Sequence, residues 1–299
     1  MKSPHLHLPF WIRVPATSAN LGPGFDAFGL ALDLHNYIAV EPGAPEIPDP
    51  FAAEIVDAYH KARGLASKPY RLVVRGLVPP ARGLGSSATI RLGMLAALDK
   101  LNKRNLDLPW LIETATTLEG HPDNITAAAL GGFVVCGGQK PARAKISAKL
   151  KFVAAIPRIE TSTRTARSLL PPSVAFQDAV LNLRNSARIA AAFLQEKYEE
   201  ARGAFADRLH QPYRAALVPG LEDAIENAEK AGAIGAFLSG AGPTVMAITL
   251  KSEVAIGQAM TKALHKAGLE SVDIKVLQAD NSGVQVVRFL PSSAREARC

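Results

Sequence analysis

The stretch PPARGLGSSAT, residues 79–89, places two glycines and three hydroxyl side chains directly after a double proline. Its glycines can adopt backbone angles that are closed to other residues, and they allow another molecule to approach the main chain. The apolar spacing that follows predicts a helix over residues 86–102, with Ser86 or Ser87 as its N-cap. A glycine-rich loop that opens a helix directs backbone N–H groups toward an anion. The stretch therefore predicts either a phosphate-binding loop or a tight turn with a capped helix.

Two familiar phosphate motifs fit this stretch poorly. A P-loop requires Gly-Lys followed by Ser or Thr, and the chain contains no Gly-Lys pair. The letters GLGSSA, residues 83–88, match the dinucleotide fingerprint, but that fingerprint should follow its strand immediately. Here residues 79–82 separate the glycines from the strand predicted over residues 70–78. The simpler anion cradle therefore remains the better interpretation.

Two further loops consist of small and polar residues. PATSANLGPGFD, residues 15–26, ends in an aspartate, and LSGAGPT, residues 238–244, follows an apolar run. Ordering such flexible loops costs conformational entropy. Three of them, each beside a predicted apolar strand, indicate one shared pocket.

Composition and charge limit the class of protein. The chain has 299 residues, of which 48% are hydrophobic and 20% charged, the balance of a globular protein. Predicted strands and helices alternate, which gives an α+β character. The chain turns polar and basic around residues 139–150, so we expect two lobes, residues 1–145 and 146–299. The net charge of +7 comes from scattered Lys and Arg. We therefore expect no nucleic-acid partner, and a nucleotide-binding or basic RNA-binding protein is the non-enzymatic alternative.

We expect no membrane association and a cytoplasmic location. The first residues lack a long apolar run, so they do not resemble a signal peptide. Residues 231–250 carry no charge, but their glycines and Pro243 predict a strand, a glycine loop and a second strand instead of a membrane span. The two cysteines, Cys136 and Cys299, do not make a disulfide framework, which favours a reducing compartment.

The three loops, together with EGHPDN at residues 119–124, resemble in their order along the chain the motifs of the GHMP small-molecule kinases. The first loop is most similar to the homoserine kinase branch of that family. The resemblance implies an α+β fold of two lobes. The N-terminal ATP-binding lobe would contain a left-handed βαβ crossover, and the C-terminal lobe would be ferredoxin-like. The active site would lie between them, and the protein would form a homodimer.

The resemblance also implies an activity. The enzyme would use ATP and Mg²⁺ to phosphorylate the hydroxyl of L-homoserine, giving O-phospho-L-homoserine for threonine biosynthesis. The alternative is a kinase of the same family that acts on another small alcohol, such as mevalonate. Phosphoryl transfer asks a protein mainly for positioning and charge stabilisation, so the residues of interest are those that hold the two substrates.

The ATP site implied by the resemblance centres on the phosphate loop. Its residues are Pro80, Ala81, Arg82, Gly83, Leu84, Gly85, Ser86, Ser87, Ala88 and Thr89. Magnesium prefers oxygen ligands, and the family pattern gives Glu119 with Ser87, or Ser86 in its place, as the candidates. A solvated glutamate at a helix end is the other interpretation of Glu119. Gly240 and Gly242, in the third glycine loop, would supply N–H groups near the phosphates.

The resemblance assigns the amino acid to residues from both halves of the chain. Arg167 and Arg214 match arginines that would bind the carboxylate, because a guanidinium can contact both of its oxygens. Asp26, the carbonyl oxygen of Asn20 and a neutral His121 would accept hydrogen bonds from the ammonium group. Either arginine could instead be an ordinary surface residue.

The hydroxyl that receives the phosphoryl group is assigned to the segment HPDN. We expect Asn124 to polarise this hydroxyl and Asp123 to support it or to act as a base. A loose transition state lets the hydroxyl proton leave late, so a strong base matters less. A simple turn is the other interpretation, because Pro-Asp-Asn is good turn chemistry.

Overall fold

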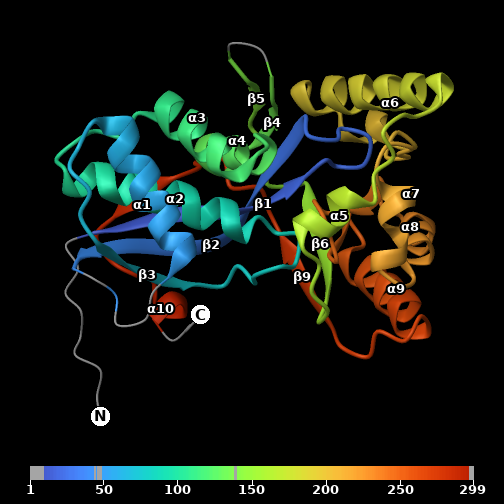
Figure 1. Cartoon of the computed structure of the whole chain (residues 1–299). Helices are drawn as coiled ribbons and strands as arrows, with labels where there is room; N and C mark the ends of the chain where they lie inside the picture. Colours follow the sequence, from blue (N-terminus) through green and yellow to red (C-terminus); the bar gives the residue numbers. More distant parts are fainter. Residues whose placement is uncertain (1–9, 44, 46–48, 138–139, 296–299) are drawn as a thin grey trace.

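The computed structural model describes residues 10–43, 45, 49–137 and 140–295. Cys299 lies outside these residues. Two antiparallel β-sheets form the centres of two lobes, and a layer of helices packs on one face of each sheet, while further helices reach the other face of the first (Figure 1). This arrangement confirms the expected two-lobed α+β fold.

The first sheet has six strands, and a long central strand organises it. The strands are β1 (Trp11–Ala19), β2 (Phe28–Pro42), β3 (Tyr70–Gly76), β4 (Phe133–Val135), β5 (Ala142–Ala144) and β10 (Gln285–Val287). Their order is β10-β1-β2-β4-β5, and β3 also pairs with β2. Strand β1 pairs along one edge of β2. The opposite edge of β2 pairs with β4 at its beginning, residues 28–30, and with β3 at its end, residues 36–42. The hand of the crossover from β3 to β4 stays a prediction.

The chain between β3 and β4 forms helices that pack on the first sheet. These helices are α2 (Ser86–Leu101), α3 (Leu108–Glu119) and α4 (Asp123–Leu130), and α1 (Pro50–Arg63) joins them from the loop after β2. Helix α2 is buried on most sides because α1, α3 and α4 surround it over the sheet. The expected N-cap of α2 is wrong, since Gly85 occupies that position with φ of 68° and no side chain caps the helix. The segment Asp123-Asn124 begins α4 instead of forming only a turn.

The second lobe has the ferredoxin-like topology. Its strands are β6 (Lys151–Pro157), β7 (Gly235–Leu238), β8 (Val245–Thr249) and β9 (Val272–Leu277), in the order β7-β8-β6-β9. Helices α8 (Leu221–Lys230) and α9 (Glu253–Lys266) cover one face of this sheet. The order of strands and helices along the chain is the β-α-β-β-α-β pattern. The strand–loop–strand prediction for residues 231–250 is confirmed, and no helix in the described ranges is long and apolar enough to cross a membrane.

The two lobes share one apolar core. Leu32 and Phe133 of the first sheet belong to the same buried cluster as Phe152 and Phe237 of the second. Helix α6 (Phe176–Leu194) contributes Phe193, which packs against Phe133 with ring centroids 4.9 Å apart. Burial of this apolar surface favours a fixed relative position of the lobes, so residues from both can build one site.

The end of the chain returns to the first sheet. Strand β10 pairs with β1, with Trp11 opposite Val287. The buried carboxylate of Asp280 anchors this return, because it accepts hydrogen bonds from Arg13 at 3.1 Å and His35 at 2.7 Å. The expected second lobe, residues 146–299, therefore includes a terminal segment that strand pairing places with the first. A long-range pairing of this kind leaves no local signal in the sequence.

Short helices complete the second lobe near the first. They are α5 (Thr163–Ser168), η1 (Tyr198–Ala201), α7 (Gln211–Arg214) and η2 (Ala215–Leu217), while α10 (Ser292–Arg295) follows β10. Helices α5 and α7 carry Arg167 and Arg214. Their packing decides where these two side chains lie.

Candidate active site

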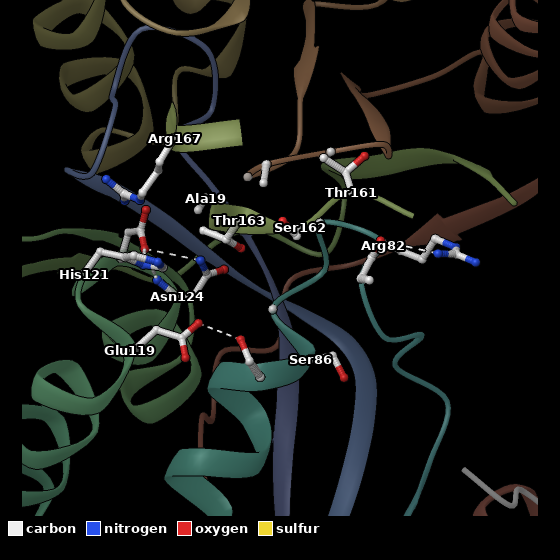
Figure 2. Close-up of a pocket in the computed structure, with 18 of the residues that line it drawn as sticks. Ala19, Arg82, Ser86, Glu119, His121, Asn124, Thr161, Ser162, Thr163 and Arg167 are labelled. Atoms are coloured by element: carbon white, nitrogen blue, oxygen red, sulfur yellow. Dashed lines mark hydrogen bonds and ion pairs between the residues drawn. The ribbon is translucent and has the colours of Figure 1, made fainter. Parts of the chain in front are cut away.

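A pocket of about 360 Å³ lies between the lobes, and residues from all four motifs line it. Figure 2 shows side chains converging on it from the start of α2, the end of α3, the start of α4 and the segment around α5. The sequence-predicted residues that line it are Asn20, Asp26, Pro80, Ala81, Arg82, Gly83, Gly85, Ser86, Ser87, Glu119, His121, Asp123, Asn124, Arg167, Arg214, Gly240 and Gly242. Segments far apart in sequence thus meet at one cavity.

Three residues of the expected ATP set do not line the pocket. Leu84, Ala88 and Thr89 are buried behind the loop. Leu84 joins the shared apolar core, and the Thr89 hydroxyl accepts a hydrogen bond from Asn36 at 2.9 Å. The helical turn that presents Ser86 and Ser87 to the cavity directs the following side chains inward.

Gly85 sets the geometry at the start of α2. With a glycine as N-cap and no capping side chain, the first N–H groups of the helix have no intrahelical partner. A Cβ on Gly85 would overlap the Thr17 hydroxyl oxygen and would lie 3.1 Å from Asn124 Oδ1. The position therefore requires glycine for two reasons, its positive φ and the close approach of Thr17.

The third glycine loop braces the phosphate loop. The Ser239 hydroxyl donates to the Gly83 carbonyl at 2.7 Å, and the Thr244 hydroxyl donates to the Arg82 carbonyl at 2.6 Å. A Cβ on Gly83 would overlap the Ser239 carbonyl oxygen. The two loops, which come from different lobes, therefore fix each other's main chain.

The N–H groups of this third loop are engaged within the protein. That of Gly240 donates to the Ala19 carbonyl at 3.2 Å, and that of Gly242 donates to the Ser239 carbonyl at 2.9 Å. We expected these groups to face the phosphates. The first of these bonds attaches the loop to β1 and the second closes the loop on itself, so both hold the loop in place.

Glu119 ends α3 beside the start of α2, and its carboxylate is held on both sides. Oε1 accepts a hydrogen bond from the Ser87 hydroxyl at 2.6 Å (Figure 2). Oε2 accepts one from Arg91 Nε at 2.9 Å. The side chain is 9% exposed, so it is not a solvated glutamate. Its carboxylate and the Ser87 hydroxyl place two hard oxygen atoms together, which suits Mg²⁺. The described ranges contain no cluster of three acidic, histidine or cysteine ligands.

Arg167 and Asp26 form an ion pair at the opposite end of the pocket. Arg167 Nη2 donates to Asp26 Oδ1 at 2.6 Å, and Nη1 donates to Oδ2 at 3.0 Å. Asp26 has φ of 56°, and its N–H donates to Asn20 Oδ1 at 3.1 Å. The expected carboxylate ligand and the expected ammonium ligand thus contact each other.

Arg214 is nearly fully buried, with 2% of its surface exposed. Its Nε donates to the Ala166 carbonyl at 3.3 Å, and its Nη1 donates to the Gly240 carbonyl at 3.0 Å and to His210 Nδ1 at 3.3 Å. Burial and the nearby Arg167 charge lower the pKa of Arg214 to about 10, so it remains a cation at neutral pH. Its Nη2 has no protein acceptor within the described ranges, which leaves this group for a ligand.

Asn20 connects the first loop to the third. Its Nδ2 donates to the Gly240 carbonyl at 3.2 Å, and its Oδ1 holds Asp26. Its main-chain carbonyl accepts from the Gly24 N–H at 3.0 Å. Both carbonyl oxygens of Asn20 are therefore already engaged, and a contact with a ligand ammonium would use their second lone pairs.

His121, Asp123 and Asn124 form a hydrogen-bonded group. Asp123 is 2% exposed, and its Oδ1 accepts from His121 Nδ1 at 3.2 Å and from the Asn124 N–H at 2.7 Å. Burial lowers the pKa of His121, but the hydrogen bond and charge of Asp123 raise it above the ordinary value overall. We expected a neutral imidazole, and its protonation state stays a prediction, with Asp123 as the contact that raises its pKa. Asn124 Oδ1 accepts from the Thr17 hydroxyl at 2.7 Å, which orients the amide.

Comparison with known proteins follows the same division into two parts. The family model for the GHMP kinases N terminal domain matches residues 51–132, and that for the GHMP kinases C terminal region matches residues 189–266. The chain is also 39% identical over 292 residues to a homoserine kinase of Aquifex aeolicus, covering 92% of this chain and 98% of the relative. The chain belongs to the GHMP kinase family.

Other similar proteins agree with this membership. A homoserine kinase of Thermus thermophilus is 42% identical over 260 residues, which cover 82% of this GHMP kinase and 88% of the relative. The crystal structure of homoserine kinase from Cytophaga hutchinsonii superposes with a TM-score of 0.81 at 25% identity, covering 93% of this chain and 97% of that one. A mevalonate kinase structure superposes with a TM-score of 0.64 at 14% identity, covering 90% of this chain and 98% of that one, which shows the shared fold alone.

Sequence reasoning missed several residues of this GHMP kinase pocket. Phe25 lines it and stacks on His210 with ring centroids 5.3 Å apart. Thr161, Ser162 and Thr163 line it ahead of Arg167. The run of hydroxyl residues before Arg167 was a usable signal for the second group. For Phe25 the signal was its place in the first loop, directly before Asp26.

Proposed function

We propose that this GHMP kinase transfers the γ-phosphoryl group of ATP to the side-chain hydroxyl of L-homoserine, giving O-phospho-L-homoserine. One observation carries the proposal: Arg167 and Arg214 line the same pocket as the uncapped start of α2. An anion site built from main-chain N–H groups and an amino-acid site built from charged side chains therefore share one cavity. The names of the similar proteins support the same substrate.

The phosphate end of the pocket suits ATP. The free N–H groups at the start of α2 would bind phosphate oxygens, aided by the helix dipole. Ser87 and Glu119 would hold Mg²⁺, which neutralises charge on the phosphates when bound. Arg82 also lines the pocket, but its side chain lies 3.6 Å from Glu160 and is directed away from the His121–Asn124 group (Figure 2).

The opposite end suits a free amino acid. Arg214 Nη2 and the Arg167 guanidinium would bind the carboxylate, and Asp26 would bind the ammonium group, with Asn20 beside it. Asn20 is hydrogen-bonded to both Asp26 and Gly240, so a substitution of Asn20 would displace Asp26 and the third glycine loop together. The charges of the ligand and of this end of the pocket are complementary.

The acceptor hydroxyl would lie between the two ends, against Asn124. Thr17 and Asp123 fix both ends of the Asn124 amide, so it can polarise a hydroxyl without reorganising. Asp123 already accepts hydrogen bonds from His121 and from Asn124. We therefore assign the hydroxyl contact to Asn124, with Asp123 as its support. His121, whose Nδ1 contacts Asp123 Oδ1 at 3.2 Å, would then act on Asp123 more than on the ligand ammonium.

The experiment measures ADP release with L-homoserine, mevalonate, galactose and shikimate in parallel, at saturating ATP and Mg²⁺. We expect turnover with L-homoserine well above that with the other three alcohols. A rate with L-homoserine equal to the rate without acceptor would end the proposal. A preference for mevalonate would select the alternative within the family.

Two finer properties belong to the same proposal. A cytoplasmic location is supported by the free thiol of Cys136, a half-buried residue. A homodimer is supported by β9, a strand at the edge of the second sheet that exposes Ile274 and Val276. Light scattering on the purified protein tests the dimer, and a mass of one chain at micromolar concentration would contradict it.

A further inference from the structure

At the amino-acid end of the pocket, two of the proposed ligand-binding side chains, Arg167 and Asp26, form an ion pair with each other. The guanidinium and the carboxylate meet through two hydrogen bonds, of 2.6 and 3.0 Å. The two residues are 141 positions apart and come from different lobes. Both side chains are 34% exposed, so the pair forms part of the pocket wall and a ligand can reach it.

The surrounding protein holds Asp26 in place and buries part of the Arg167 side chain. Asp26 is positioned by its N–H bond to Asn20 and by a positive φ, which aspartate tolerates better than most residues. The Arg167 guanidinium carbon lies 5.3 Å from the centroid of the Phe25 ring. Its Nε is buried, with no hydrogen-bond partner within the described ranges. The pair is therefore a built feature of the pocket, unlike the contacts of long surface side chains.

The second guanidinium raises the cost of opening the pair. Arg214 lines the same pocket, and the Arg167 charge is near enough to lower its pKa. If Arg167 leaves Asp26, its guanidinium loses two hydrogen bonds to a carboxylate and stays near the Arg214 cation. Charged groups in such a partly buried site are costly to leave unpaired.

We propose that the Arg167–Asp26 ion pair selects zwitterionic substrates, because only a zwitterion replaces both halves of the pair. This inference rests on the proposed function. The carboxylate of an amino acid takes the place of Asp26 on Arg167, and its ammonium group takes the place of Arg167 on Asp26. A carboxylate without an amine leaves Asp26 unpaired, and an amine without a carboxylate leaves Arg167 unpaired.

A simpler role for Asp26 makes a different prediction. If Asp26 only binds the ammonium group, Asp26→Asn weakens the binding of L-homoserine. The binding of 4-hydroxybutyrate, which lacks the amine, then stays the same. If Asp26 also holds Arg167 away from ligands, the same substitution frees Arg167 and strengthens the binding of 4-hydroxybutyrate. The sign of the change for the analogue therefore separates the two roles.

The experiment compares wild type with Asp26→Asn, using kcat/KM for both acceptors and calorimetric binding of 4-hydroxybutyrate without nucleotide. We expect the kcat/KM of Asp26→Asn for L-homoserine to be at least about a hundredfold lower than that of wild type, since a charged contact is lost. We expect kcat/KM and affinity for 4-hydroxybutyrate to rise roughly three- to tenfold. This factor corresponds to the free energy of a partly exposed ion pair. No gain for 4-hydroxybutyrate, in either readout, overturns the inference.

The matched control is Asp273→Asn. Asp273 pairs with Arg158 at 3.4 Å on the exposed surface of the second lobe, outside the pocket. This substitution removes the same charge from the protein, so it corrects for a general electrostatic effect. We expect both acceptors to keep wild-type kcat/KM, and a gain for 4-hydroxybutyrate equal to that of Asp26→Asn would overturn the inference.

A reciprocal variant keeps the inference testable if Asp26→Asn does not fold. Arg167→Gln frees Asp26, so we expect 3-amino-1-propanol, which lacks the carboxylate, to gain affinity by a similar factor. Unchanged or weaker affinity would count against the ion pair as a selector. A wild type that neither binds nor phosphorylates L-homoserine refutes the proposed function itself. Turnover of L-homoserine without these gains refutes only the inference.

Discussion

The two ends of the pocket are built from different parts of the protein. The phosphate end consists of main chain, where Gly85 opens α2 and leaves N–H groups free. The amino-acid end consists of charged side chains, where Arg167 meets Asp26 and Arg214 is buried beside them. The first end depends on backbone angles that a few neighbouring residues set. The second depends on contacts between segments more than a hundred positions apart.

This difference predicts how each end fails. A main-chain site fails when a side chain is added, because there is no room for it and the backbone angle is lost. A side-chain site fails when a charge is removed, because its partners remain in place without it. Four substitutions test this contrast, in order of decreasing expected effect.

Gly85→Ala should have the largest effect. Its Cβ would overlap the Thr17 hydroxyl, and alanine is strained at φ of 68°. A strained residue costs about 1–3 kcal/mol before any clash, and the clash adds to this cost, so kcat/KM for ATP should fall at least about a thousandfold. Steady-state kinetics at varied ATP concentration measure this fall in kcat/KM.

Gly64→Ala is the control for backbone strain alone. Gly64 caps α1 with φ of 63°, and a Cβ there would meet nothing within 4 Å. This variant should lose about 1 kcal/mol of unfolding free energy and keep its kcat/KM. If Gly85→Ala behaved in the same way, the phosphate end would not depend on the close main-chain approach.

Arg214→Gln should have the next largest effect. It removes a buried cation whose acceptors, the Ala166 and Gly240 carbonyls, stay in place. We expect kcat/KM for L-homoserine to fall about 100- to 1,000-fold, mainly through KM, because losing one partner of a buried charged contact costs roughly 2–5 kcal/mol. Arg158→Gln, at a side chain that is 67% exposed, is the control and should change nothing. A selective rise in the KM for ATP would contradict the assignment of Arg214 to the amino acid.

Thr17→Val should have a smaller effect, confined to kcat. Valine keeps the shape of threonine but removes the hydroxyl that orients Asn124. Loss of one hydrogen bond of about 1–2 kcal/mol corresponds to a roughly five- to thirtyfold lower kcat, with both KM values unchanged. Thr117→Val, at an exposed position of α3, is the control. A change in KM without a change in kcat would show that Thr17 positions substrates instead of Asn124.

His121→Asn should have the smallest effect, visible as a pH dependence of stability. Burial lowers the pKa of His121, but Asp123 raises it above the ordinary value overall. A raised folded-state pKa stabilises the protein fully below the unfolded value of about 6.5 and loses this contribution as pH rises through the folded value. Wild type should therefore exceed the variant in unfolding free energy most at low pH. Urea unfolding from about pH 5.5 to about pH 8.5 spans this window, with His265→Asn on the exposed side of α9 as control. A difference that grows with pH would contradict the direction.

Local patterns predicted several elements and the place of the phosphate loop. Helix α2, strand β3 and the strand–loop–strand unit of β7 and β8 lie where the apolar spacing and the glycines put them. The N-cap of α2 was wrong because a serine is the usual cap, whereas this helix begins at a glycine in the left-handed region. That departure is what leaves the helix N–H groups free. The return of β10 to β1 could not be predicted, because strand pairing across the length of the chain has no local signature.

The turns of the main chain can be located from the amino-acid sequence, because backbone angles depend on glycines and on the few residues beside them. The sequence also shows which charged residues are available to meet an amino acid. The pairing of Arg167 with Asp26, the burial of Arg214 and the contact of Glu119 with Ser87 depend on the folded structure. Those contacts join distant segments, and the packing of two lobes around a shared core is what brings such segments together.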